Sequence, residues 1–151
     1  VGQAKAPELQ LANLSNEKQM KGWEHLSDND ADVIVIQISD NYRGKQNAEE
    51  FQNNYAQMIR DLRGDRDPII VCLTNWGGGK LNEMIQAAAK ENNALAVDLA
   101  PLAANPENKA GSEGHFTNGG VNWHPGDRGM AAIADAAFTV LEAPLKAKAA
   151  K

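Results

Sequence analysis

The sequence predicts an α/β fold with a doubly wound parallel sheet. Apolar runs of strand length alternate along the chain with segments whose apolar residues recur at helical spacing, which is typical of repeated strand–helix–strand units. The clearest run, residues 32–38, contains four consecutive β-branched residues from Val33 to Ile36. A run of this kind is typical of a strand that is covered on both faces, as the strands of a parallel sheet are.

The expected elements follow one another in a regular order. Strands are predicted over residues 8–13, 32–38, 68–73 and 94–99, and helices over residues 14–26, 51–63, 81–89 and 130–141. The second of these helices is the best formed, because Phe51 is followed by apolar residues at offsets of four, seven, eight and eleven. Residues 103–120 show no periodicity, so we expect a long loop there. A loop of this length in a compact domain usually serves a site.

Length and composition are those of one ordinary globular domain. The 151 residues are 42% apolar and carry a formal net charge of −5. We assign residues 1–145 to the domain and expect the Lys- and Ala-rich residues 146–151 to be a disordered tail. The basic residues are scattered, which argues against a nucleic-acid partner. The longest apolar run is too short to cross a bilayer, so no membrane association is expected.

Cys72 is the only cysteine, so the chain forms no internal disulfide. It lies in an apolar run and is predicted to be a buried strand residue rather than a nucleophile. The sequence begins at Val1 and contains no signal peptide, so we expect a chain that was processed, trimmed or cut from a longer one. The compartment is left open, a secreted or periplasmic location included.

Polar residues follow the predicted strands at the ends that should meet. Right-handed crossovers bring the carboxyl ends of parallel strands to one edge of the sheet, where ligands bind. We therefore expect residues 13–16, 39–41 and 75–76 to converge with the loop around His124. This loop contains Gly, Pro and Trp and precedes the last helix, which makes His124 a candidate general base. The alternative is a structural loop histidine.

Several common catalytic motifs do not occur in the chain. There is no G-x-S-x-G elbow, no G-x-x-x-x-G-K-[ST] phosphate loop and no H-E-x-x-H pair. The glycines at 77–79 precede a helix and could hold an anion, but they lack the accompanying Ser/Thr and acidic residue. A flavin- or nucleotide-binding domain that uses this loop is the weakest alternative. His25 and His115 have no ligand-like spacing with His124, so no metal site is expected.

The order of these parts resembles the SGNH (GDSL-like) hydrolases over about residues 7–141. The stretch Ile38-Ser39-Asp40-Asn41 is similar to the third block of that family, normally G-x-N, and residues 121–130 are similar to its last block, in which the catalytic His precedes Pro. Residues 11–15 resemble the region of the second block. The resemblance implies a flavodoxin-like, three-layer α/β/α domain.

The resemblance also implies a function and a set of site residues. The chain would be part of a serine esterase that hydrolyses small acyl esters, including acetylated carbohydrates, without a metal or organic cofactor. His124 would act as general base and then general acid, and Asn41 would donate to the oxyanion together with backbone groups around Ser15, Asn16 and Ser39. Trp76, Asn75 and Trp123 would line the acyl or sugar pocket, although the two tryptophans are equally expected as packing residues.

Three departures from the family pattern affect the mechanism. The G-D-S or G-N-S block that carries the nucleophile is absent, and Ser39 is a poor substitute for that Ser. Ser39 also replaces the Gly of the third block, which is a mild departure because Ser39 can still present its backbone N–H. The family's Asp three residues before the His is Val121 here. A backbone carbonyl or a carboxylate would therefore have to orient His124, and the candidate carboxylates are Asp40, Asp98 and Asp127.

The absent block also carries the family's first strand, which lies between the strands predicted at residues 8–13 and 32–38. Its removal would leave two strand edges unpaired within the sheet. We therefore expect a second polypeptide, or a preceding segment of a longer protein, to supply this strand and the Ser. The competing hypothesis is a rearranged, non-catalytic relative that binds a carbohydrate or a protein.

Overall fold

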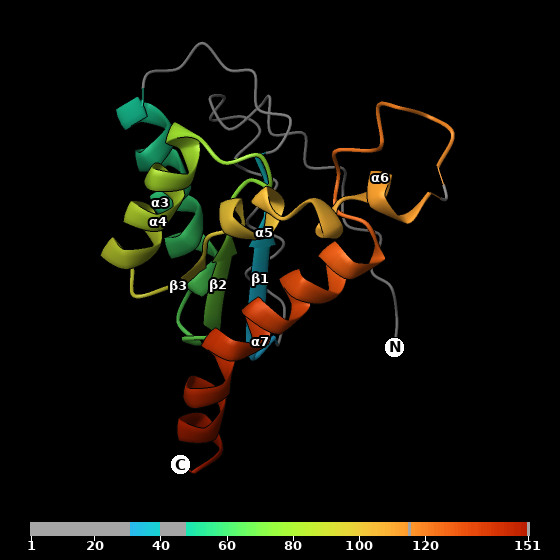
Figure 1. Ribbon diagram of the computed structural model, residues 1–151. Helices are drawn as coiled ribbons and strands as arrows, with labels where there is room; N and C mark the ends of the chain where they lie inside the picture. Colours follow the sequence, from blue (N-terminus) through green and yellow to red (C-terminus); the bar gives the residue numbers. More distant parts are fainter. Residues whose placement is uncertain (1–30, 40–47, 115, 151) are drawn as a thin grey trace.

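The computed structural model describes residues 31–39, 48–114 and 116–150 and shows a mixed α/β fold (Figure 1). Its strands are β1 (Val33–Gln37), β2 (Ile69–Leu73) and β3 (Leu95–Val97). Its helices are α3 (Ala48–Arg63), α4 (Lys80–Glu91), α5 (Ala100–Ala104), the 3-10 helix η2 (Pro106–Asn108), α6 (Ala110–Glu113) and α7 (Asp127–Ala149). Three predicted strands and three predicted helices are confirmed. The strand expected at 8–13 and the helix expected at 14–26 lie outside the described residues.

The three strands form a parallel sheet in the order β1-β2-β3. Val33 is aligned with Ile69 and Val71 with Leu95, so the carboxyl ends of the strands meet at one edge, as the sequence predicted. Strand β2 is the central strand of the described sheet, and its last four residues are buried.

Helices α3 and α4 cover one face of the sheet. The apolar stripe predicted for α3 is confirmed, because Phe51, Tyr55, Met58, Ile59 and Leu62 are all buried. They pack in one cluster with Ile70 and Cys72 of β2 and with Ile85 of α4. The periodicity of the sequence therefore fixed both the helix and the face that it buries.

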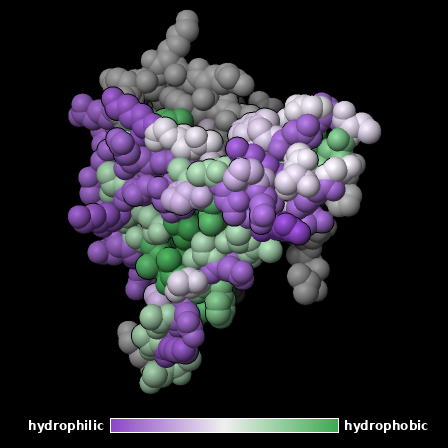
Figure 2. All heavy atoms as spheres, viewed as in Figure 1, coloured by the Kyte–Doolittle hydropathy of each residue, from purple (hydrophilic) through white to green (hydrophobic). Residues whose placement is uncertain are grey.

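Helix α7 covers the other face of β2 and β3. Ile133 and Ala137 of α7 pack in a second cluster with Val71, Leu73 and Val97. The alternation of Ile70 and Cys72 with Val71 and Leu73 divides β2 between the two clusters, since successive side chains of a strand point to opposite faces. Apolar residues gather over the strands and α7 in the view of Figure 2, whereas α3 and α4 present hydrophilic residues there.

Two expectations about irregular segments were wrong. The loop predicted over residues 103–120 contains η2 and α6, which are too short to produce a periodic pattern. The tail expected to be disordered from residue 146 instead continues α7 to Ala149, because Ala and Lys are good helix formers and Lys146 pairs with Glu142 one turn earlier at 2.7 Å. In the part of the chain described, no helix combines the length and the apolar character needed to span a membrane.

The central strand yields a testable prediction about Cys72. This residue is fully buried, which confirms its expected place in a strand, and burial raises the pKa of its thiol to about 11. The reactive thiolate is therefore a negligible fraction near pH 7. We expect a thiol-reactive disulfide reagent to modify the native protein very slowly and the urea-unfolded protein quickly. Equal rates in the two states would contradict the packing described for β2.

Candidate functional site

The carboxyl edge of the sheet carries a polar group after each strand. Ser39 follows β1, Thr74 and Asn75 directly follow β2, and Asp98 directly follows β3. Ser39, Thr74 and Asn75 are buried, although loops at a sheet edge are usually open to water. The sequence therefore predicted correctly that polar residues from 39 and from 75 converge there.

Ser39 and Asn75 form a direct hydrogen bond across the edge. The Ser39 hydroxyl donates to Oδ1 of Asn75, and only 1% of Ser39 and 8% of Asn75 is exposed. The backbone of Ser39 has φ 102°, in the left-handed region that favours glycine. A buried serine in this conformation persists only where its surroundings hold it, and such strain is concentrated at functional sites.

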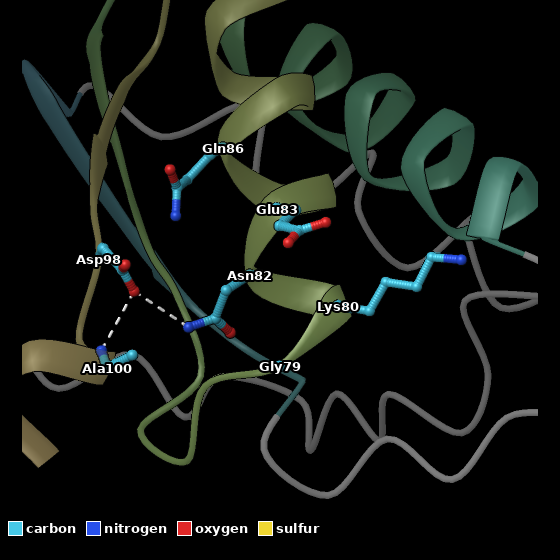
Figure 3. Close-up of a pocket in the computed structure, with 7 residues that line it drawn as sticks. All are labelled: Gly79, Lys80, Asn82, Glu83, Gln86, Asp98 and Ala100. Carbon is cyan, nitrogen blue, oxygen red and sulfur yellow. Dashed lines mark hydrogen bonds between the residues drawn. The ribbon is translucent and has the colours of Figure 1, made fainter. Parts of the chain in front are cut away.

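Asn82 of α4 connects the ends of β2 and β3. Its Oδ1 accepts from the Asn75 backbone N–H at 3.1 Å, and its Nδ2 donates to the Asn75 carbonyl at 3.1 Å and to the Thr74 hydroxyl at 2.8 Å. The same Nδ2 donates to Oδ1 of Asp98 at 3.1 Å, and this oxygen also accepts from the Ala100 backbone N–H at 3.1 Å (Figure 3). The Thr74 hydroxyl donates to the same oxygen at 3.1 Å.

Asn82 was missed by the sequence analysis. It is 4% exposed and occupies the buried face of an amphipathic helix, three residues before the fully buried Ile85. A polar residue at an apolar position of a helix was the available signal, because such a residue needs hydrogen-bond partners inside the protein. An open hollow of about 510 Å³ lies beside it, lined by Gly79, Lys80, Asn82, Glu83, Gln86, Asp98 and Ala100. Lys80 extends away from Asp98 in this view (Figure 3).

The loop that carries His124 is held by backbone hydrogen bonds to η2 and α6. The carbonyl of His124 accepts from Ala110 at 2.9 Å, the carbonyl of Asn122 accepts from Gly111 at 3.0 Å, and Gly126 donates to Asn108 at 2.9 Å. The segment predicted as a structureless loop thus fixes the position of the candidate base. This gives residues 105–114 a structural role that their sequence did not reveal.

Trp76 links the His124 loop to the end of β2. Its indole N–H donates to the carbonyl of Trp123 at 2.8 Å, and its ring is 2% exposed in a cluster with Val97 and Leu99. Burial favours the packing alternative for Trp76. Trp123 differs, since 47% of it is exposed and its ring lies 4.1 Å from the His124 imidazole with 34° between the planes.

His124 is exposed and has no carboxylate partner among residues 31–39, 48–114 and 116–150. Asp98, one of the carboxylates expected to orient it, is instead hydrogen-bonded to Thr74, Asn82 and Ala100. Asp127 begins α7 and makes no ion pair with the imidazole. Neither Asp98 nor Asp127 therefore contacts the imidazole, and Asp40 and a backbone carbonyl are the candidates that remain.

The remaining predicted site residues cannot be compared with the structure. Ser15, Asn16, Asp40 and Asn41 lie outside the described residues. Within the described ranges, no three His, Cys, Asp or Glu side chains lie close enough together to hold a metal ion.

Comparison with known proteins provides no relative for this chain. No protein-family model matches it, and neither the curated proteins nor the solved structures that were searched match it. The functional argument therefore depends on the residues of the sheet edge and on their geometry.

A glycine substitution tests how tightly the His124 loop is held. A Cβ on Gly129 would lie 2.1 Å from the Asn108 carbonyl oxygen, which is far inside contact distance. We expect Gly129→Ala to lower the free energy of unfolding by about 2 kcal/mol, because this overlap outweighs the gain of about 1 kcal/mol in helix propensity.

Gly119→Ala is the matched control, since a Cβ there meets nothing within 4 Å. Its free energy of unfolding should stay within about 0.5 kcal/mol of the parent value. Urea unfolding of the three proteins gives the comparison, and an unchanged stability of Gly129→Ala would contradict the close packing of η2 against α7.

Proposed function

We propose that the carboxyl edge of the sheet is the active site of a serine esterase of the SGNH type. The domain would have the doubly wound, flavodoxin-like, three-layer α/β/α architecture of that family, and the substrate would be a small acyl ester, including an acetylated sugar. The observation that carries the proposal is Ser39. It adopts a glycine-like backbone conformation, with φ 102°, at the position where the family's third block has Gly.

The conformation of Ser39 fits a role in oxyanion binding. Backbone N–H groups that are fixed in place before the reaction stabilise the charge that develops on the carbonyl oxygen of an ester. Ser39 is fixed by burial and by its bond to Asn75. Asn41, two residues further on, would add its side-chain amide, and the backbone around Ser15 and Asn16 would supply further donors.

His124 would act as the base and then as the acid. It would take the proton of the attacking Ser hydroxyl while the Ser oxygen bonds to the ester carbon. It would then give this proton to the departing alcohol oxygen as the ester bond breaks. Water would repeat both steps to release the acid. The hydrogen bonds at the His124 and Asn122 carbonyls and the bond from Trp76 to Trp123 support this role, because a general base must be held in place.

The nucleophilic Ser would come from a preceding segment or from a second polypeptide, together with a strand beside β1. Two features of β1 support this. Among the described residues, β1 pairs with β2 alone. Val35 of β1 is 52% exposed, whereas its register partner Val71 is completely buried under α7. An exposed apolar side chain on an edge strand is the feature that an added strand and its covering layer would bury. His124 would be oriented by the segment that supplies the Ser, by Asp40 or by a backbone carbonyl.

The second candidate function is a non-catalytic binding module. The observation that favours it is Trp123, whose ring is half exposed beside an exposed His124. An exposed indole next to a polar ring is suited to stacking against a sugar. Hydrolysis of a reporter ester by the protein, with any polypeptide that accompanies it, separates the enzyme from the binding module.

The first functional prediction concerns His124. His124→Ala should abolish ester hydrolysis, because no other histidine lies in the described loop to take the proton. Its melting temperature should change little, because the side chain is exposed and the loop is held through backbone atoms. Initial rates and thermal unfolding, measured on the same samples, test this. A loss of stability without a loss of turnover would favour a structural histidine.

The second functional prediction concerns Asn41. Asn41→Ala should lower kcat by on the order of 10²–10³ with a smaller effect on KM, since an oxyanion donor acts mainly in the transition state. Asn53→Ala, at an exposed position of α3, is the control and should leave both constants unchanged. Steady-state kinetics on a reporter acetate ester provide the test, and equal kcat values for parent and Asn41→Ala would remove Asn41 from the mechanism.

A further inference from the structure

Asn75 is held more firmly than packing at a strand end requires. Its backbone N–H and C=O are both bound by the side chain of Asn82, at 3.1 Å each. Asn82 is in turn fixed by the Thr74 hydroxyl and by Asp98. Both backbone groups of Asn75 are therefore satisfied by one buried side chain of a neighbouring helix, and the residue has little freedom to move.

The side chain of Asn75 is oriented as well. Its Oδ1 accepts a hydrogen bond from the Ser39 hydroxyl, so Nδ2 is the end of the amide that remains available. Nδ2 makes no hydrogen bond with the part of the chain that the structure describes. Only 8% of the Asn75 surface is exposed. Nδ2 is not among the buried polar atoms that lack a partner, so this donor is open to solvent. An amide that is fixed at three atoms and presents its donor to solvent is arranged to receive an acceptor from outside the chain.

We propose that Nδ2 of Asn75 binds an acyl oxygen of the ligand, the carbonyl oxygen of an ester or an oxygen of the product carboxylate, and that the Ser39 hydroxyl orients this amide. This inference depends on the proposed acyl-ester function and gives Asn75, which follows β2, a specific contact with the ligand. Asn75 touches the ligand through Nδ2, whereas the Ser39 hydroxyl and Asn82 position Asn75. This role accounts for a serine at position 39, because a glycine there would have no hydroxyl to orient the Asn75 amide.

Acetate is the probe that tests this inference without requiring turnover. Nitrogen-15 NMR of the side-chain amides should show the Asn75 Nδ2 resonances moving as sodium acetate is added, with sodium chloride at equal ionic strength as the reference. Asn75→Asp keeps an oxygen for the Ser39 hydroxyl but replaces the donor with a carboxylate. We expect it to weaken acetate binding about tenfold or more, measured from the shifts of neighbouring backbone amides.

Asn53→Asp is the matched control. It introduces the same extra negative charge at an exposed position of α3 and should leave acetate binding unchanged. Ser39→Gly removes the orienting hydroxyl while permitting φ 102°, so it should weaken acetate binding several-fold without lowering the melting temperature. A purely structural role for the Ser39–Asn75 bond would produce the opposite pattern, with a lower melting temperature and unchanged binding.

The results separate this inference from the esterase proposal. Acetate shifts that are lost in Asn75→Asp support the Asn75 site even if the protein hydrolyses no ester. Ester hydrolysis that depends on His124, together with equal acetate affinity in Asn75→Asp and Asn53→Asp, would overturn the role of Asn75 and leave the esterase proposal intact. An absence of acetate shifts at Asn75 in the parent protein would also overturn it.

Discussion

The double-sided burial of β2 is the constraint on which the rest of this structure depends. Because Ile70 and Cys72 pack toward α3 and α4 while Val71 and Leu73 pack toward α7, the strand cannot shift or rotate without exposing one of two apolar clusters. The polar residues that follow β2 are therefore held in a fixed position at the sheet edge. Asn82 on one side and Trp76 on the other then connect that point to α4 and to the His124 loop.

Much of this arrangement was predictable from the sequence. The β-branched run before Ser39 and the apolar stripe of α3 gave the strands and helices, and parallel topology then brought Ser39 and Asn75 to one edge. The left-handed backbone of Ser39 was not predictable, because it depends on burial and on the contact with Asn75. The partners of Asp98 were equally hidden, since they involve a helix residue sixteen positions earlier, Asn82.

The His124 loop illustrates a different limit of sequence analysis. Its position is set by backbone atoms of η2 and α6, and backbone hydrogen bonds leave almost no trace in residue identity. The sequence shows a trace of this packing only where two segments approach so closely that a glycine is needed. Gly111 is such a position, because a Cβ there would lie 2.9 Å from Cβ of Asn122. Short rigid segments of this kind hold a loop in place while leaving its side chains exposed, which is how Trp123 and His124 are presented.

The central claim is that this edge is an acyl site completed by a strand and a Ser from outside the segment described. The most direct test is the intact mass, under denaturing conditions, of the protein as isolated from the cells that make it. The account predicts a second polypeptide or a mass well above 16.3 kDa. A single species of 16.3 kDa would contradict it, because no further segment would then supply the strand and the nucleophile, and the binding module would become the better explanation.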